Sequence, residues 1–98
     1  MAKSEVNNKF YQVKKTIGGK EYIAQFSGIS MSMKAVDSCY IENSRNISSE
    51  KMTQYILDNV IVEPKGLKID DFDSLEELQE VTEFGQKVMG GSLRSEAI

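Results

Sequence analysis

The chain has 98 residues, with 12 Lys and Arg against 15 Asp and Glu, no His, no Trp and one Cys. A chain of this length buries only about 60–65% of its unfolded surface, so we expect one small domain. The lack of His excludes imidazole catalysis and imidazole metal ligands, and a single Cys excludes an internal disulfide or a Cys-rich zinc site. The net charge of −3 argues against a nucleic acid or membrane held by overall charge.

The charge is distributed unevenly along the chain. Residues 1–34 carry six Lys and two Glu, a net +4, whereas residues 35–98 carry six basic and thirteen acidic side chains, a net −7. Solvated faces that happen to differ are one explanation. The other is that a basic end of one copy meets an acidic end of another, as in head-to-tail self-association.

No segment has the character of a membrane-spanning or secretory helix. The chain has no run of about 18 apolar residues, and most of residues 1–9 are polar. We therefore expect a cytoplasmic protein that does not bind membranes, with a flexible N-terminus over residues 1–9. In a reducing compartment the lone Cys39 is expected to be a small buried hydrophobe rather than a reactive thiol.

Two alternating segments joined by Gly18 and Gly19 predict a β-hairpin. Residues 10–17 and 20–26 are rich in β-forming residues, and their apolar side chains recur at every second position. A Gly-Gly pair supplies the positive φ angles of a tight hairpin turn. A phosphate-binding loop is not expected here, because its first glycine and the Ser or Thr after Lys20 are missing.

Two helices are predicted next. The first runs from about residue 31 to residue 42 with Ser30 as its cap, and the second begins at Ser48 or Ser49 and ends near Val60. Each has an apolar stripe that we expect to face the core. The stripes comprise Ile29, Met33, Val36 and Tyr40 in the first helix, and Met52, Tyr55, Ile56 and Val60 in the second.

An extended connector follows, because Pro64 biases Glu63 away from the α region and ends the second helix. Ser74 and Glu77 then form a capping box, and Phe72 is placed to fold back over the first helical turn.

The third helix runs from about residue 75 to residue 89 through an apolar stripe that includes Leu75, and ends at Gly90 and Gly91. Residues 92–98 are expected to form a frayed tail. The predicted fold is α+β and helix-dominated, with an N-terminal β-hairpin followed by about three α-helices in a single globular domain over residues 10–91.

Acidic side chains gather before and along the third helix, but no pattern marks them as an active site. Asp70, Asp71 and Asp73 do not have the spacing of an EF-hand, and negative charge there suits the positive end of the helix dipole. The glutamates farther along are expected to be solvated and ionised. No catalytic, metal-binding or cofactor-binding residue is predicted, and we do not expect an enzyme.

The hairpin offers one alternative. Lys14, Lys15 and Lys20 lie among aromatic residues, and such a sheet can stack on single-stranded nucleic acid. Two strands make a small platform in an acidic domain. We rather expect the aromatic side chains to pack on the helices.

The segment Val60-Ile61-Val62-Glu63-Pro64-Lys65, followed by Asp70-Asp71-Phe72 and an acidic amphipathic helix, resembles the tail assembly chaperones of long-tailed phages of Gram-positive bacteria. Phe84, Gly85, Gly90 and Gly91 are similar to the end of that family's last helix. The resemblance covers about residues 10–91.

The resemblance implies a non-enzymatic protein of the host cytoplasm, absent from the finished virion. Such proteins self-associate, coat the tape-measure protein and bring tail-tube subunits to it, and many also have a longer frameshifted form. A different small phage structural or regulatory protein, such as a connector or an inhibitor of a host protein, is the alternative. The expected partner-binding residues are Lys14, Lys15, Lys20, Glu76, Glu80 and Glu83.

Overall fold

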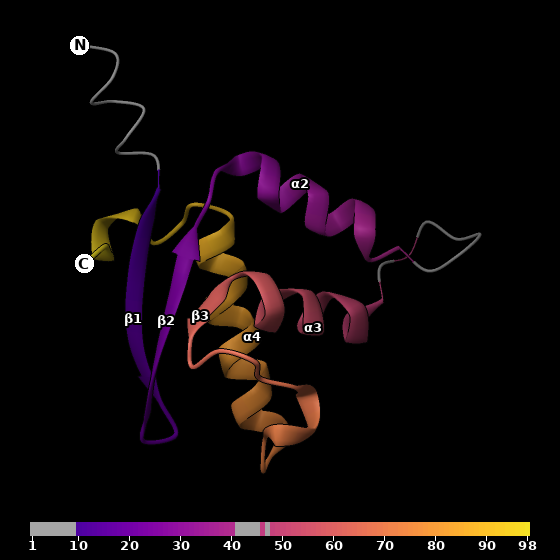
Figure 1. Ribbon diagram of the computed structural model, residues 1–98, viewed down its shortest axis with the longest axis vertical. Coiled ribbons are helices and arrows are strands. Elements are labelled where there is room, and N and C mark those ends of the chain that lie inside the picture. The colour runs from indigo at the N-terminus through magenta and orange to yellow at the C-terminus, as the bar shows by residue number, and fades with distance from the viewer. Residues whose placement is uncertain (1–9, 41–45, 47) are drawn as a thin grey trace.

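The computed structural model describes residues 10–40, 46 and 48–98 (Figure 1). Within these residues, three strands and three α-helices make up an α+β fold, which is the predicted fold class. In chain order they are β1 (Tyr11–Ile17), β2 (Lys20–Phe26), α2 (Ile29–Ser38), α3 (Ser49–Asn59), β3 (Ile61–Glu63) and α4 (Leu75–Met89), with 3-10 turns η1 (Ile69–Asp71) and η2 (Arg94–Glu96). The flexible N-terminus expected over residues 1–9 lies outside the described residues.

The hairpin forms as predicted. Ile17 pairs with Lys20, so the loop consists of Gly18 and Gly19, whose φ angles of 60° and 79° are both positive. The space at Gly18 is also needed, because a Cβ atom there would lie 2.9 Å from the Glu77 carboxyl carbon. Both glycines therefore have the structural role that the sequence gives them.

The third strand was predicted only as an extended connector. β3 pairs antiparallel with β2, so β2 is the central strand of a sheet with the order β1-β2-β3. A strand of three residues is too short to show an alternating pattern, and its pairing partner lies far away in the sequence. Only the assembled sheet identifies it.

The helices cover one face of the sheet. Val13 and Ile17 of β1 and Tyr22, Ala24 and Phe26 of β2 are all buried, while the alternate positions point away from the core. α4 contacts both long strands, and α2 and α3 pack beside it on the same side (Figure 1). The buried side chains of sheet and helices form one hydrophobic cluster.

The first predicted helix is displaced. α2 begins at Ile29 with Gly28 as its N-cap, so the prediction of Ser30 as the cap is wrong. Gly28 has a φ of 98°, and no side chain caps the helix. Glycine alone adopts this backbone conformation freely, and the chain can therefore turn directly from β2 into the helix. The helix ends at Ser38 rather than near residue 42.

The predicted core stripe of this helix is wrong except at Val36, which is partly buried against the core. Ile29, Met33 and Tyr40 are 56%, 65% and 41% exposed. The helix instead buries Ala35, and Cys39 just after it, whose small side chains allow a close approach to α3 and α4. α2 thus has apolar side chains on its inner face and a second apolar stripe facing outward.

Pro64 does not end the second helix, contrary to the prediction. α3 begins after Ser48, whose hydroxyl accepts a hydrogen bond from the Lys51 N–H at 3.2 Å, as expected of a capping serine. It ends at Asn59 because the chain then enters the sheet as β3. Pro64 follows Glu63, the last residue of that strand, through a cis peptide bond.

α4 has the predicted bounds and is the central helix of the core. Val81, Phe84 and Val88 are almost fully buried, but Leu75, which was predicted to belong to the same stripe, is 67% exposed. Gly85 lies where α4 meets α3, and a Cβ atom there would clash with Ile56. A side-chain-free position therefore lets the two helices approach each other.

Residues 92–98 were expected to form a frayed tail, and the structure corrects this. Ala97 pairs with Val13, and the Ile98 N–H donates a hydrogen bond to the Gln12 carbonyl at 2.8 Å. The Arg94 guanidinium lies 4.9 Å from the centre of the Tyr11 ring, a cation–π contact. Backbone pairing to the edge of β1 holds the segment, and the local sequence carries no periodic signal for it.

Candidate functional site

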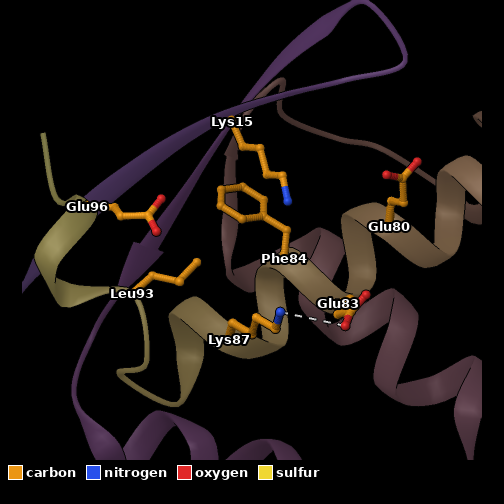
Figure 2. Close-up of a pocket in the computed structure, with 7 residues that line it drawn as sticks. All are labelled: Lys15, Glu80, Glu83, Phe84, Lys87, Leu93 and Glu96. Atoms are coloured by element: carbon orange, nitrogen blue, oxygen red, sulfur yellow. Dashed lines mark ion pairs between the residues drawn. The ribbon is translucent and has the colours of Figure 1, made fainter.

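Three of the residues predicted to bind partners come together on one face of α4. Lys15 of β1 extends toward Glu80 and Glu83 of α4, and these side chains line a depression of about 280 Å³ (Figure 2). Phe84 and Leu93 form its apolar part. The remaining lining residues are Lys87 and Glu96.

The charges in this depression largely neutralise one another. The Lys87 ammonium lies 3.7 Å from the Glu83 carboxylate, and both side chains are more than half exposed. An exposed pair of this kind contributes about 0–1 kcal/mol to stability. The depression contains two cationic and three anionic side chains, a mixture that favours no ligand of a single charge.

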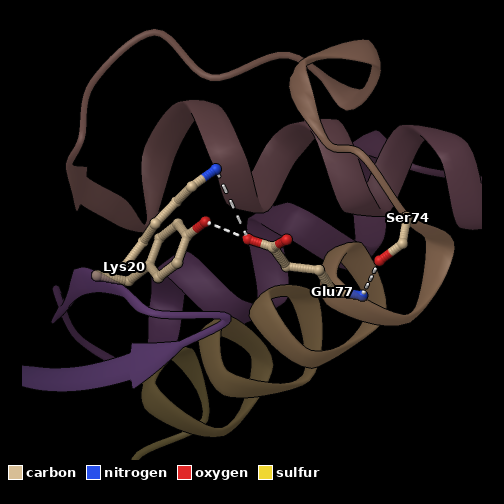
Figure 3. Close-up of polar contacts among 4 residues, drawn as sticks. Lys20, Ser74 and Glu77 are labelled. Carbon is tan, nitrogen blue, oxygen red and sulfur yellow. Dashed lines mark hydrogen bonds and ion pairs between the residues drawn. The ribbon is translucent and has the colours of Figure 1, made fainter.

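Lys20, also predicted to bind a partner, is directed at the start of α4 (Figure 3). Its ammonium lies 4.0 Å from the Glu77 carboxylate, and the Tyr22 hydroxyl donates a hydrogen bond to the same carboxylate at 3.1 Å. Burial, followed by the hydrogen bond and the charge of Glu77, raises the pKa of Tyr22 to about 12. This polar contact fastens the tip of the hairpin to α4.

Glu77 therefore does not complete the predicted capping box. The Ser74 hydroxyl accepts a hydrogen bond from the Glu77 N–H at 3.2 Å, which is the expected half of the motif. The Glu77 side chain contacts the hairpin instead. Phe72 does not simply fold back over the helix either, because its ring stacks on Tyr22 with 6.5 Å between centroids.

The other predicted contact residues lie apart from this face or at its margin. Strand alternation places Lys14 on the face of the sheet opposite to Lys15. Glu76 is exposed on α4, seven residues before Glu83, and so follows the same side of the helix. The six residues do not form one continuous surface.

This arrangement bears on the charge asymmetry of the sequence. α4 packs against β1 and β2, so the basic hairpin and the acidic helix lie beside each other within one copy. The imbalance of +4 and −7 along the chain consequently does not become two separated charged ends in these elements.

Two of the four aromatic side chains of the hairpin region are not available for stacking on bases. Tyr22 and Phe26 are 1% and 3% exposed, because they belong to the core face of the sheet. Buried rings cannot stack on bases, whereas Phe10 is 59% exposed and Tyr11 is partly exposed.

A larger depression lies between α2, α3 and α4, and the sequence did not predict it. It has a volume of about 880 Å³. Side chains of all three helices line it, with hydroxyl and amide groups such as Thr82 and Gln79 between the apolar ones. We call it the helical groove, and its apolar lining residues are Val36, Met52, Leu75, Leu78 and Met89.

The helical groove continues onto the exposed stripe of α2. Val36 lines the groove and also belongs to that stripe, together with Ile29 and Met33, and the exposed Tyr40 follows just after the helix. The signal for this surface was present in the sequence as two apolar stripes, which we interpreted as core. Leu75 and Met33, at 67% and 65% exposed, are among the large apolar side chains that remain accessible.

The described residues hold no group of three or more His, Cys, Asp or Glu side chains that could bind a metal ion. Asp71 is used locally, since its carboxylate accepts a hydrogen bond from the Lys68 N–H at 2.9 Å. Cys39 is buried, and this burial raises the pKa of its thiol despite the nearby charge of Lys51. Within the part of the chain described, no helix is long and apolar enough to cross a membrane.

No protein-family model, no curated protein and no solved structure matches this chain. We therefore infer its function from its own residues and geometry, and from the short sequence motif that precedes α4.

Proposed function

We propose that this chain is a phage tail assembly chaperone that self-associates and binds tape-measure and tail-tube proteins during tail morphogenesis. It acts without a cofactor in the cytoplasm of the bacterial host and is absent from the mature virion. The resemblance of residues 60–65 and 70–72 to that family supports this proposal.

The helical groove is the observation that carries the protein-binding part of the proposal. An open depression of about 880 Å³, in which apolar side chains alternate with hydroxyl and amide groups, continues into exposed Ile29 and Met33. Contiguous apolar surface of this kind on a small domain marks sites of protein association. A chaperone that shields another chain needs such a surface.

The self-association part of the proposal is better placed on apolar contacts than on opposite charged ends. Lys20 and Glu77 already pair within one copy, and Lys15 lies in the same depression as Glu80 and Glu83. Exposed charges are screened beyond about 8 Å at 0.15 M salt. Light scattering across a salt series separates the two modes, because only charge-driven assembly loses mass as salt rises.

Co-expression with the tail-tube and tape-measure proteins of the same genome tests the proposal. We expect this chain to co-purify with both and to keep the tape-measure protein soluble. Co-expression with an unrelated coiled-coil protein of similar length is the control. If neither tail protein co-purifies, the proposal is wrong, and recovery of a host protein instead would favour a regulatory phage protein.

A further inference from the structure

We propose that the helical groove, together with the outer stripe of α2, binds an amphipathic α-helix whose apolar stripe is flanked by Lys and Arg. This inference rests on the proposed function, because it names the partner chemistry of the surface that carries it. Shape, backbone chemistry and charge each support it.

The shape of the groove suits a helix. It follows α4 from Leu75 to Met89, a length of about 20 Å at 1.5 Å per residue. This length matches about four turns of a bound helix. The α2 stripe extends the apolar surface sideways from Val36 to Met33, so the contact is wider than the groove alone.

The groove walls favour a helix over an extended peptide. All three walls are α-helices, whose backbone groups are already hydrogen-bonded along most of their length. A bound strand pairs with a sheet edge, and among the described residues no strand contributes to the lining. A helix satisfies its own backbone and presents apolar side chains at a spacing of three and four residues.

The edges of this surface are acidic. Glu83 lines the groove, and Glu76, seven residues before it, lies on the same side of α4, whereas Glu80 belongs to the other depression with Lys15. The Lys87 ammonium lies 3.7 Å from the Glu83 carboxylate, so two carboxylates against one ammonium leave this edge with a net −1. On the far side Asp37 is exposed on α2, next to the stripe. Basic residues flanking the apolar stripe of a partner would complement both edges.

A second copy fits the same surface less well. In a two-fold pair formed through this surface, acidic edges would approach acidic edges, which is unfavourable. Lys34 does not relieve this, because at 100° per residue it lies about 130° around α2 from the centre of the apolar stripe. The charges therefore favour a basic helix over another copy of this chain.

The test uses two synthetic helical peptides of about twenty residues with the same Leu stripe, one flanked by Lys and the other by Glu. Fluorescence anisotropy with the full-length protein measures both affinities. We expect the Lys-flanked peptide to bind at least tenfold more tightly than the Glu-flanked one, with an affinity that weakens as salt rises. Equal binding of the two peptides, or binding of neither, would overturn the inference.

Matched variants locate the binding site. Met33→Ser with Leu75→Ser removes exposed apolar side chains from the stripe and the groove, and we expect at least a tenfold loss of affinity. Ile98→Ser removes an equally exposed apolar side chain beside β1 and should change nothing. A loss of similar size in both proteins would contradict the proposed location.

A charge reversal tests whether the acidic edge of the helical groove contributes to binding. Glu83→Lys should lower the affinity for the Lys-flanked peptide and raise the affinity for the Glu-flanked one. Glu21→Lys is the control, because it changes the net charge equally at an exposed position on β2 that does not line the groove. Equal effects of the two variants would show that only overall charge matters. If neither peptide binds but Met33→Ser with Leu75→Ser lowers the mass in light scattering, a second copy is the occupant.

The failure of this inference is distinguishable from failure of the proposed function. If the Met33→Ser, Leu75→Ser protein still co-purifies with the two tail proteins, the chaperone function stands and the groove is not its site. If the peptides bind as expected but neither tail protein co-purifies, the groove assignment stands and the chaperone function fails.

Discussion

α4 and α2 show how the same sequence pattern leads to two different environments. Both helices have apolar residues at helical spacing, and both stripes are predicted to face the core. The stripe of α4 buries Val81, Phe84 and Val88, whereas the predicted stripe of α2 leaves Ile29 and Met33 more than half exposed. Periodicity shows that one face of a helix is apolar, but it does not show which element covers that face.

The two helices also differ in how the rest of the molecule holds them. α4 contacts both long strands and both other helices, and its start is fixed by Ser74 and by the contact of Glu77 with Tyr22. α2 begins at Ile29, and its N-cap, Gly28, provides no side-chain hydrogen bond. The comparison indicates that α4 is part of the folding core, while the outer face of α2 is available to a partner.

Phe84→Ala should have the largest effect, because it removes a ring that is 2% exposed from the centre of α4. We expect a loss of about 3–5 kcal/mol in the free energy of unfolding, a large share of the stability of a small domain. Urea denaturation followed by circular dichroism measures it. Val88→Ala provides a milder variant if Phe84→Ala does not fold, and a loss below about 1 kcal/mol in both would show that α4 is not the core helix.

Tyr22→Phe should have an intermediate effect, because it removes the hydrogen bond to Glu77 that fastens α4 to the hairpin. We expect a loss of about 1–2 kcal/mol at neutral pH, measured by urea denaturation. Tyr11→Phe is the matched control, since among the described residues the buried Tyr11 hydroxyl has no hydrogen-bond partner. Tyr11→Phe should leave the free energy of unfolding almost unchanged. An equal loss of stability in both variants would contradict the Tyr22–Glu77 contact.

The same contact predicts a pH dependence. Burial and Glu77 raise the pKa of Tyr22 from 10.0 to about 12, so the unfolded chain releases this proton at a lower pH than the folded chain does. The stabilising contribution is complete below about pH 10 and is lost as the pH rises to about 12. In Tyr22→Phe the fall in stability over this interval should be smaller than in the unaltered protein.

Met33→Ser should have the smallest effect on stability, because the side chain is 65% exposed. A change within about 0.5 kcal/mol is expected in the same urea titration. Together with the large effect of Phe84→Ala, this would confirm that the two stripes have different roles. A loss above about 1 kcal/mol would instead mean that the α2 stripe is covered in solution.

The candidate site was only partly accessible to prediction. Lys15, Glu80 and Glu83 were singled out for their charge, and the structure does bring them together, but beside two further charged residues from α4 and the C-terminal segment. The helical groove was missed, because side chains of three separate helices line it. The pattern of each helix alone does not show how the three pack together. The apolar residues that form it, such as Leu75, had been assigned to the core.

Local chemistry was enough to predict the hairpin at Gly18 and Gly19, the serine caps of α3 and α4 and the bounds of α4, because each depends on neighbouring residues and short-range hydrogen bonds. Only the tertiary structure decided that β3 joins the sheet, that residues 92–98 pair with β1 and that the outer stripe of α2 stays exposed. These features depend on contacts between segments far apart in the sequence, where the geometry of the whole assembly determines which apolar faces are buried.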